Sequence, residues 1–194
     1  MKLFNAFLTG ILLLTAISTR AQENYSISAY TVTIDGTSNL HSWNEKVEKV
    51  SGKGVIKASA NKEFTFHSFN IIMEVNSIKS TEGSGMNKKT YKALKSDKYP
   101  EISFVLTEPV IAKTDGSGNY SANAKGTLTI AGVTKTITMP IKISEDADKK
   151  ITVAGVQKVK MSDYNVSAPT AMLGILKTGD AITINFNTTF SLLN

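Results

Sequence analysis

The stretch KTITMPIKI at residues 135–143 alternates polar and apolar side chains along its length. One parity holds Ile137, Met139, Ile141 and Ile143, and the other holds Thr136, Thr138 and Lys142. Successive side chains of a β-strand point to opposite faces of a sheet, so this stretch predicts a strand with one dry and one wet face. A helix would instead need apolar residues three and four positions apart.

The same two-residue period recurs along the chain. Residues of predicted inward parity are Phe69, Ile71, Met73 and Val75, then Ile102, Phe104 and Leu106, then Leu128 and Ile130, and finally Ile182, Ile184, Phe186, Phe190 and Leu192. Turn signals such as Asp35-Gly36 and Ala131-Gly132 separate the runs. About eight or nine strands with short connections predict an all-β, antiparallel domain, either a closed barrel or a two-sheet sandwich.

The N-terminal segment has the pattern of a cleaved secretory signal peptide. Lys2 precedes a mostly apolar run over residues 3–17, and Thr19-Arg20-Ala21 ends it with small residues at the positions that a signal peptidase reads. The alternative is a membrane anchor, but a spanning helix needs about 20 apolar residues. We therefore expect residues 1–21 to be removed, residues 22–194 to form one domain, and the protein to be periplasmic or secreted.

Composition excludes several classes of protein. The 194-residue chain is 41% hydrophobic and 20% charged, which is typical of a globular domain, and it has no cysteine for disulfides or thiolate metal sites. Loss of Lys2 and Arg20 would lower its formal net charge from +6 to +4, too small a bias to indicate a nucleic-acid partner.

Two segments break the strand pattern. Residues 83–100 predict a short helix that begins near Gly85 or Met86 with Ser84 as its cap. Met86, Thr90, Ala93 and Leu94 would lie on one face and Lys88, Lys92 and Lys95 on the other. Residues 161–180 have no clear period, and a loop of this length is typical of a functional rim, although its apolar residues could also plug one end of a barrel.

Catalytic and metal-binding patterns are absent from the sequence. The chain has only two histidines, His41 and His67, and His67 shares the inward parity of Phe69, so we expect it to point to the apolar side. No nucleophile elbow, phosphate-binding glycine loop or metal-ligand spacing occurs. We expect no enzyme activity, no metal and no cofactor.

The apolar inner face is the remaining candidate site. A barrel of about eight strands can be filled by its own side chains or can hold one small ligand. A long apolar ligand needs little more than buried methylenes, each of which contributes about 0.8 kcal/mol. The residue pattern is compatible with both a filled core and a binding cavity.

Several motifs resemble the YceI-like domain family. These are Leu40-His41-Ser42-Trp43 with Val50-Ser51-Gly52, the segment from Met86 through Tyr99-Pro100 to Phe104, the hairpin at residues 126–135, and Met161-Ser162-Asp163-Tyr164. They follow the family's order and cover nearly all of residues 24–192. The family's usual Arg-Asp pair in the helix is replaced by Met86-Asn87-Lys88-Lys89, so no head-group contact is carried over from that site.

The resemblance implies a lipocalin-like barrel whose cavity binds a polyisoprenoid or another long-chain amphiphilic lipid. The residues expected to line the cavity are Phe69, Met73, Met86, Leu94, Phe104, Leu128, Met139, Met172, Leu173 and Phe186. His41, Trp43 and Tyr164 are candidate polar contacts at its mouth. The lysine face of the helix is a candidate for transient contact with a membrane surface. The alternative to a lipid carrier is a structural or stress-response barrel with a filled core that acts through a protein partner.

Overall fold

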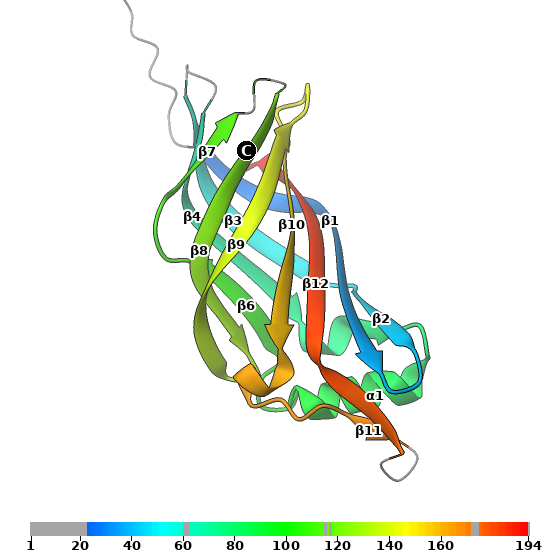
Figure 1. Cartoon of the computed structure of the whole chain (residues 1–194). Coiled ribbons are helices and arrows are strands. Elements are labelled where there is room, and N and C mark those ends of the chain that lie inside the picture. The colour runs from blue at the N-terminus through cyan, green and yellow to red at the C-terminus, as the bar shows by residue number, and fades with distance from the viewer. Residues whose placement is uncertain (1–22, 60–62, 115, 117, 172–174, 194) are drawn as a thin grey trace, which may run out of the picture.

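The alternating segments close into an antiparallel β-barrel of eight strands, seen in a computed structural model (Figure 1). The structure describes residues 23–59, 63–114, 116, 118–171 and 175–193. The barrel strands are β1 (Glu23–Ser38), β3 (Val50–Ala58), β4 (Phe64–Glu74), β6 (Glu101–Leu106), β8 (Asn119–Ile130), β9 (Val133–Glu145), β10 (Ile151–Lys160) and β12 (Leu176–Leu192). The prediction of a single antiparallel barrel is confirmed, and the sandwich alternative is wrong.

Pairing between the first and last strands closes the barrel. β1 and β12 are antiparallel neighbours from Tyr25 opposite Leu192 to Ser38 opposite Thr178. The remaining order is β12-β10-β9-β8-β6-β4-β3-β1. Because this order returns to its start, the barrel has no long free edge.

Four short strands extend the barrel at its two ends. β7 (Val110–Thr114) pairs with β4 and β8 beyond the end of β6, so β6 and β7 share one place in the wall. β2 (Ser42–Val47) pairs with β1 and with β5 (Ile78–Ser80) at the end nearer the helix. β11 (Thr170–Ala171) pairs with the start of β12.

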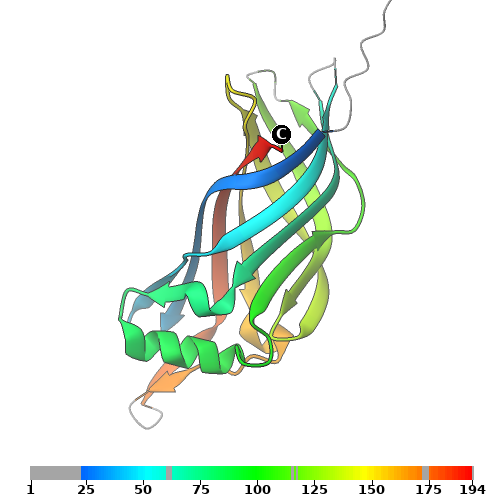
Figure 2. The same cartoon turned by 180° about the vertical axis from the view of Figure 1, so that it is seen from behind.

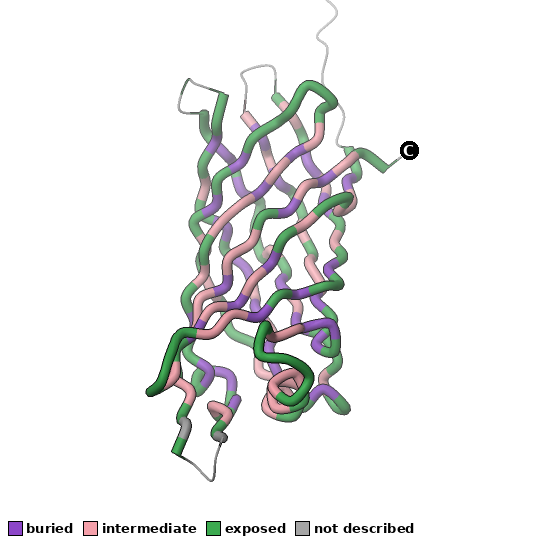
Figure 3. Tube along the Cα trace, turned by 90° about the vertical axis from the view of Figure 1, so that its right-hand side faces the viewer, coloured by how far each residue is buried: buried purple, intermediate pink, exposed green. Residues whose placement is uncertain are grey.

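Burial follows the predicted alternation, as the colours of Figure 3 show. Ile102, Phe104, Leu128 and Ile130 are buried on the inner face. Leu192, expected on the same face as Phe190, is 38% exposed because it lies at the very end of β12.

A bulge in β4 makes the prediction for His67 wrong. Val55 pairs with Ser68 but the next residue, Ile56, pairs with Phe66, so His67 is the extra residue of a β-bulge. The inward parity therefore changes along β4, from Phe64 and Phe66 before the bulge to Phe69 and Met73 after it. His67 points outward and is exposed.

The hairpin between β8 and β9 fixes the position of the Tyr99-Pro100 step. Its two turn residues, Ala131 and Gly132, have φ of 48° and 80°, as a two-residue turn of type I′ requires. The ring of Tyr99 lies over Gly132, where a Cβ atom would be 2.4 Å from Cε1 of the ring. Gly132 thus supplies both a positive φ and room for an aromatic side chain.

The predicted helix is α1 (Ser84–Ala93), which lies across one end of the barrel (Figure 2). Asn87 holds it to β5 by accepting a 2.7 Å hydrogen bond from the backbone N–H of Ser80. The prediction of Ser84 as a side-chain cap is wrong, because the cap position is Gly83 and Ser84 is the first helical residue. Lys88, Lys92 and Lys95 are exposed, as predicted.

The second irregular segment is shorter than predicted. The 3-10 helix η2 (Met161–Tyr164) follows β10 directly, and β12 begins at Leu176 rather than after Asp180. Asp180 accepts hydrogen bonds from the N–H and hydroxyl of Ser162 at 2.8 and 2.6 Å, which ties η2 to β12 and lowers the pKa of the Asp180 carboxyl. The early start of β12 extends this wall past the end of the barrel, beside α1 (Figure 1).

The end of the barrel opposite α1 is closed by aromatic packing. Phe64 and Tyr120 meet edge to face with ring centroids 4.7 Å apart, and Phe69 and Phe190 lie 4.5 Å apart. Phe190 is completely buried. Among the described residues, these ring contacts fill the interior of the barrel at this end.

Candidate ligand cavity

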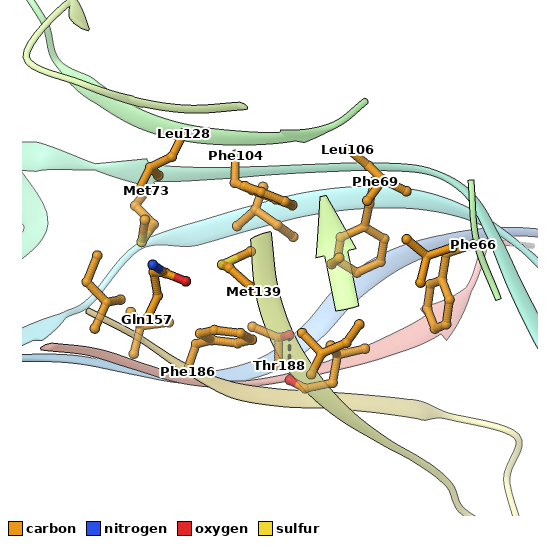
Figure 4. A pocket seen from close by; sticks show the side chains of 17 residues that line it. Phe66, Phe69, Met73, Phe104, Leu106, Leu128, Met139, Gln157, Phe186 and Thr188 are labelled. Atoms are coloured by element: carbon orange, nitrogen blue, oxygen red, sulfur yellow. Dashed lines mark hydrogen bonds between the residues drawn. The ribbon is translucent and has the colours of Figure 1, made fainter. Parts of the chain in front are cut away.

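A central cavity of about 90 Å³ occupies the middle of the barrel (Figure 4). Its wall includes all six strand residues predicted from parity, which are Phe69, Met73, Phe104, Leu128, Met139 and Phe186. These side chains come from β4, β6, β8, β9 and β12 and point toward one another across the barrel (Figure 4). That they contact a ligand stays a prediction.

Phe186 is only half-buried, although its inward parity predicts a buried side chain, whereas Phe104 is buried. The reason is its place at the cavity wall, where part of the ring faces empty space rather than another side chain. The ring lacks dispersion contacts on the side that faces unfilled volume. A ligand in that volume would supply these contacts and so stabilise the protein.

The wall of the central cavity is almost entirely apolar. The two exceptions are Gln157 of β10 and Thr188 of β12. The Thr188 hydroxyl donates a 3.1 Å hydrogen bond to the carbonyl of Val153, and the Gln157 amide donates one of 2.9 Å to the carbonyl of Lys158. None of the described side chains that line this cavity is ionisable, so the cavity suits a hydrocarbon chain.

A second cavity, also of about 90 Å³, lies at the end of the barrel nearer α1. Four of the residues predicted for the site line it, namely Trp43, Met86, Leu94 and Tyr164. Ile184 lines both cavities, so the two adjoin at this side chain. The second cavity therefore lies between α1 and the central cavity, and Ile184 stands between the two.

The second cavity contains a buried carboxyl that the sequence interpretation missed. Glu45 of β2 is 4% exposed and lines the cavity, and its Oε1 accepts a 2.5 Å hydrogen bond from the hydroxyl of Thr90 on α1. Burial raises the pKa of Glu45; the hydrogen bond from Thr90 lowers it, and the charge of Glu82 raises it further. The sequence did contain a signal for this position. Glu45 has the same parity within β2 as the apolar residues Trp43 and Val47, which predicts that its side chain points inward.

A shallow outer groove adjoins the second cavity. It is lined by His41, Glu82 and Lys89, among others, and His41 is paired with Glu82 there. His41 thus lies outside the cavity, at the surface of the groove. The groove and the second cavity share Trp43, Met86, Pro169 and Thr178. These four residues therefore lie between the outer groove and the second cavity.

The segment over residues 161–180 contributes to the second cavity. Met161, Tyr164, Val166 and Pro169 line it. Ile175 is 69% exposed and points away. Met172 and Leu173 lie outside the described residues, so their role at the rim stays a prediction.

The two cavities are small. Each is well below the roughly 300–1,000 Å³ of a pocket for a drug-sized ligand. A long ligand therefore requires lining side chains to move aside. Met73, Met86 and Met139 line the cavities, and methionine adapts more readily than a branched side chain to a changed apolar shape.

Over the described ranges, no three His, Asp or Glu side chains come together in a group that could hold a metal ion. None of the helices in this part of the chain has the length and apolar character needed to cross a membrane.

Comparison with known proteins places this barrel in a family. The family model of the YceI-like domain matches residues 19–190. The chain belongs to the YceI-like domain family. A search of curated protein sequences gives no match.

Solved structures similar to this YceI-like domain include BcnA of Burkholderia cenocepacia, at 22% identity and a TM-score of 0.62 over 84% of this chain and 96% of that one. A polyisoprenoid binding domain from Saccharophagus degradans, described as implicated in plant cell wall breakdown, is 13% identical with a TM-score of 0.63 over 87% and 98%. The YceI protein of Campylobacter jejuni is 21% identical with a TM-score of 0.56 over 77% and 84%. At these identities the similarity shows a shared fold.

Proposed function

We propose that this YceI-like barrel is a non-enzymatic binding protein that carries or sequesters one long-chain amphiphilic lipid, with a polyisoprenoid as the leading candidate. The observation that carries the proposal is the pair of adjoining cavities, of which the central one is lined almost entirely by apolar side chains and the other lies at the α1 end of the barrel. The polyisoprenoid-binding neighbour from Saccharophagus degradans supports the ligand class.

Binding follows from burial of hydrocarbon. Each methylene removed from water contributes about 0.8 kcal/mol, from which the cost of ordering the chain must be subtracted. A ligand whose tail reaches the central cavity would replace empty volume beside Phe186 and Met139 with new contacts. Because that cavity has few polar groups, the length of the hydrocarbon chain, rather than a specific head group, should supply most of the affinity.

We also propose that the protein acts after export and exchanges its ligand with membranes. The basic start, apolar run and Ala21 of the N-terminal segment support export. Exposed Lys88 and Lys92 on α1 lie at the end of the barrel that carries the second cavity and the outer groove, which would bring that end to an anionic lipid surface.

The experiment is native mass spectrometry of residues 22–194 purified from an exporting cell without detergent, followed by extraction and identification of bound lipid. We expect one long-chain lipid per protein, released on unfolding. A protein that is free of lipid, and that also fails to take up a polyisoprenol during refolding, would contradict the proposal.

The small volume of both cavities favours a second candidate, a structural or stress-response barrel with a filled core that acts through a protein partner. The same measurement separates the two, because a filled core takes up no lipid under either condition. A partner recovered with lipid-free protein would then support the second candidate.

A further inference from the structure

Glu45 is an unusual residue for the interior of a lipid-binding barrel. It is 4% exposed, and it is the carboxyl among the residues that line the two cavities. A carboxyl in such a place costs free energy unless hydrogen bonds or an opposite charge compensate for the lost water. A Gln or Leu at this position would avoid that cost. The presence of a carboxyl instead suggests that it has a function in binding.

The surroundings of Glu45 leave it able to accept further hydrogen bonds. Thr90 donates one hydrogen bond to Oε1, whereas an ionised carboxylate has about four acceptor positions. Its strand neighbours are Ile34 of β1 and Ser80 of β5. Tyr164 and Lys160 line other parts of the same cavity, and Glu82 adds negative charge from nearby.

The position of Glu45 relative to the two cavities is also informative. It lies in the second cavity, between the outer groove and the purely apolar central cavity. A lipid whose tail fills the central cavity would leave its polar end beside Glu45 and Thr90. The Trp43 ring, which lines the same cavity, would lie alongside that polar end.

We infer that Glu45 and Thr90 form a head-group site for a lipid whose polar end donates hydrogen bonds, such as an alcohol or an amine, and that the site rejects a phosphate or carboxylate end. This inference rests on the proposed function. An alcohol or ammonium donates to the carboxylate, and an ammonium also compensates its charge. A phosphate would meet the Glu45 carboxylate and the nearby Glu82 in a site of low dielectric, where repulsion between like charges is strong.

The test compares three ligands that share one isoprenoid tail and differ only in the head group, with a saturated hydrocarbon of the same carbon skeleton as the ligand that lacks a head group. Geranylgeraniol, geranylgeranylamine, geranylgeranyl phosphate and the saturated hydrocarbon phytane are titrated into delipidated protein near neutral pH. The readout is the fluorescence of Trp43, the single tryptophan of the chain, which lines the second cavity. We expect the alcohol and the amine to bind at least tenfold more tightly than the phosphate.

The variant Glu45→Gln keeps the shape of the side chain and its acceptor for Thr90 but removes the charge. It should bring the Kd of the amine and of the phosphate within about threefold of each other and leave phytane binding unchanged. Glu48→Gln is the matched control, since Glu48 is an exposed carboxyl three residues further along the chain. The Glu48→Gln protein should bind the four ligands in the same order of affinity as the wild type.

The outcomes separate the inference from the function on which it rests. If all four ligands bind equally well, or if Glu45→Gln leaves the preference for the amine intact, the head-group site is disproved and lipid binding stands. If none of the four binds, phytane included, both the head-group site and the proposed lipid binding are disproved.

Discussion

Gly155 of β10 lies directly opposite Phe186 of β12, and the ring of Phe186 occupies the space that a side chain at position 155 would need. A Cβ atom there would lie 2.5 Å from Cζ of the ring and 2.8 Å from the carbonyl oxygen of Pro140. Gly54 and Phe69 repeat the arrangement across β3 and β4. Glycine in these strands thus lets aromatic rings from the next strand lie flat along the cavity wall.

The first prediction is that Gly155→Ala destabilises the barrel by about 1–3 kcal/mol, since overpacking a formed core has this cost. The new methyl group would push Phe186 into the central cavity, because the backbone at Pro140 blocks the other direction. Urea unfolding of lipid-free protein measures the change.

Gly85→Ala is the control, because Gly85 is in α1 and a Cβ atom there would have no other atom within 4 Å. Alanine there should be neutral or stabilising by up to about 1 kcal/mol. Equal effects at the two sites would contradict the packing argument.

The second prediction concerns the inner face of β6. Phe104 is 6% exposed and lines the central cavity, whereas its neighbour Val105 is 42% exposed on the outer face. Phe104→Asp should cost about 3–5 kcal/mol or prevent folding, because it buries an unpaired charge. Val105→Asp should change the free energy of unfolding by no more than about 0.5 kcal/mol. A soluble Phe104→Asp protein that retains lipid would refute the assignment of the inner face.

The barrel and its inner face could be predicted because they depend on local alternation. Each run of Ile, Phe and Met at every second position specifies one buried face regardless of the strand beside it. The outward turn of His67 could not be predicted this way, because the β4 bulge exists only in the pairing of β4 with β3. Parity counted from Phe69 therefore assigned His67 to the wrong face.

The candidate site was predictable only in its apolar part. Phe104 and Met139 were placed by parity, and the carboxyl of Glu45 was overlooked because charged residues are usually assigned to a solvated face. Its partner Thr90 is 45 positions away along the chain. The contact forms only because α1 packs across the end of the barrel against β5 and β2, an arrangement that no local pattern specifies.

The third prediction is a pH-dependent stability effect of Glu45. Burial raises its pKa above the ordinary value of 4.5, against the opposing effect of the Thr90 hydrogen bond. The folded state then binds the proton more tightly than the unfolded state. The stability contributed by the protonated carboxyl is complete below pH 4.5 and is lost as the pH rises through the folded-state pKa.

Glu45→Gln should therefore have a higher Tm than the lipid-free wild type near neutral pH. The difference should shrink as the pH falls through the folded-state pKa towards 4.5, and it should change no further below 4.5. Thermal unfolding followed by circular dichroism at a series of pH values measures this. The other ionisable groups nearby are Glu82, whose charge acts on Glu45, and Lys160 and Tyr164 in the same cavity, and all three are unchanged in the variant. A wild type that is the more stable protein at neutral pH would show that the ionised carboxyl stabilises the fold instead.

The fourth prediction concerns membrane contact at the α1 end. Lys88, Lys92 and Lys95 are exposed, and each basic residue near an anionic surface contributes about 1 kcal/mol. Changing all three to Gln should sharply weaken binding to phosphatidylglycerol vesicles at low salt, as measured by co-sedimentation. The control triple variant changes Lys57, Lys113 and Lys142, which are exposed on strands at the opposite end of the barrel. If the two triple variants lose binding equally, net charge rather than the α1 surface directs the contact.

The last prediction is that residues 161–180 frame the ligand entrance. A barrel that holds a lipid must admit it, and hydrogen-bonded strands do not part without a large cost. The described part of this segment already lines the second cavity through Tyr164, Val166 and Pro169, and Pro169 also lines the outer groove. Entry should therefore occur between this segment and the side of α1 that carries Met86.

Replacing Met172 and Leu173 with Ser should then weaken lipid retention more than it lowers the stability of the lipid-free protein. Lipid release to acceptor vesicles and urea unfolding measure the two effects separately. Ile175→Ser is the control, because Ile175 is close to them in the sequence and is 69% exposed, so its replacement should alter neither quantity. If the double variant instead loses several kcal/mol of folding free energy while its folded fraction retains lipid normally, these residues plug the end of the barrel. Lipid would then enter through another part of the wall.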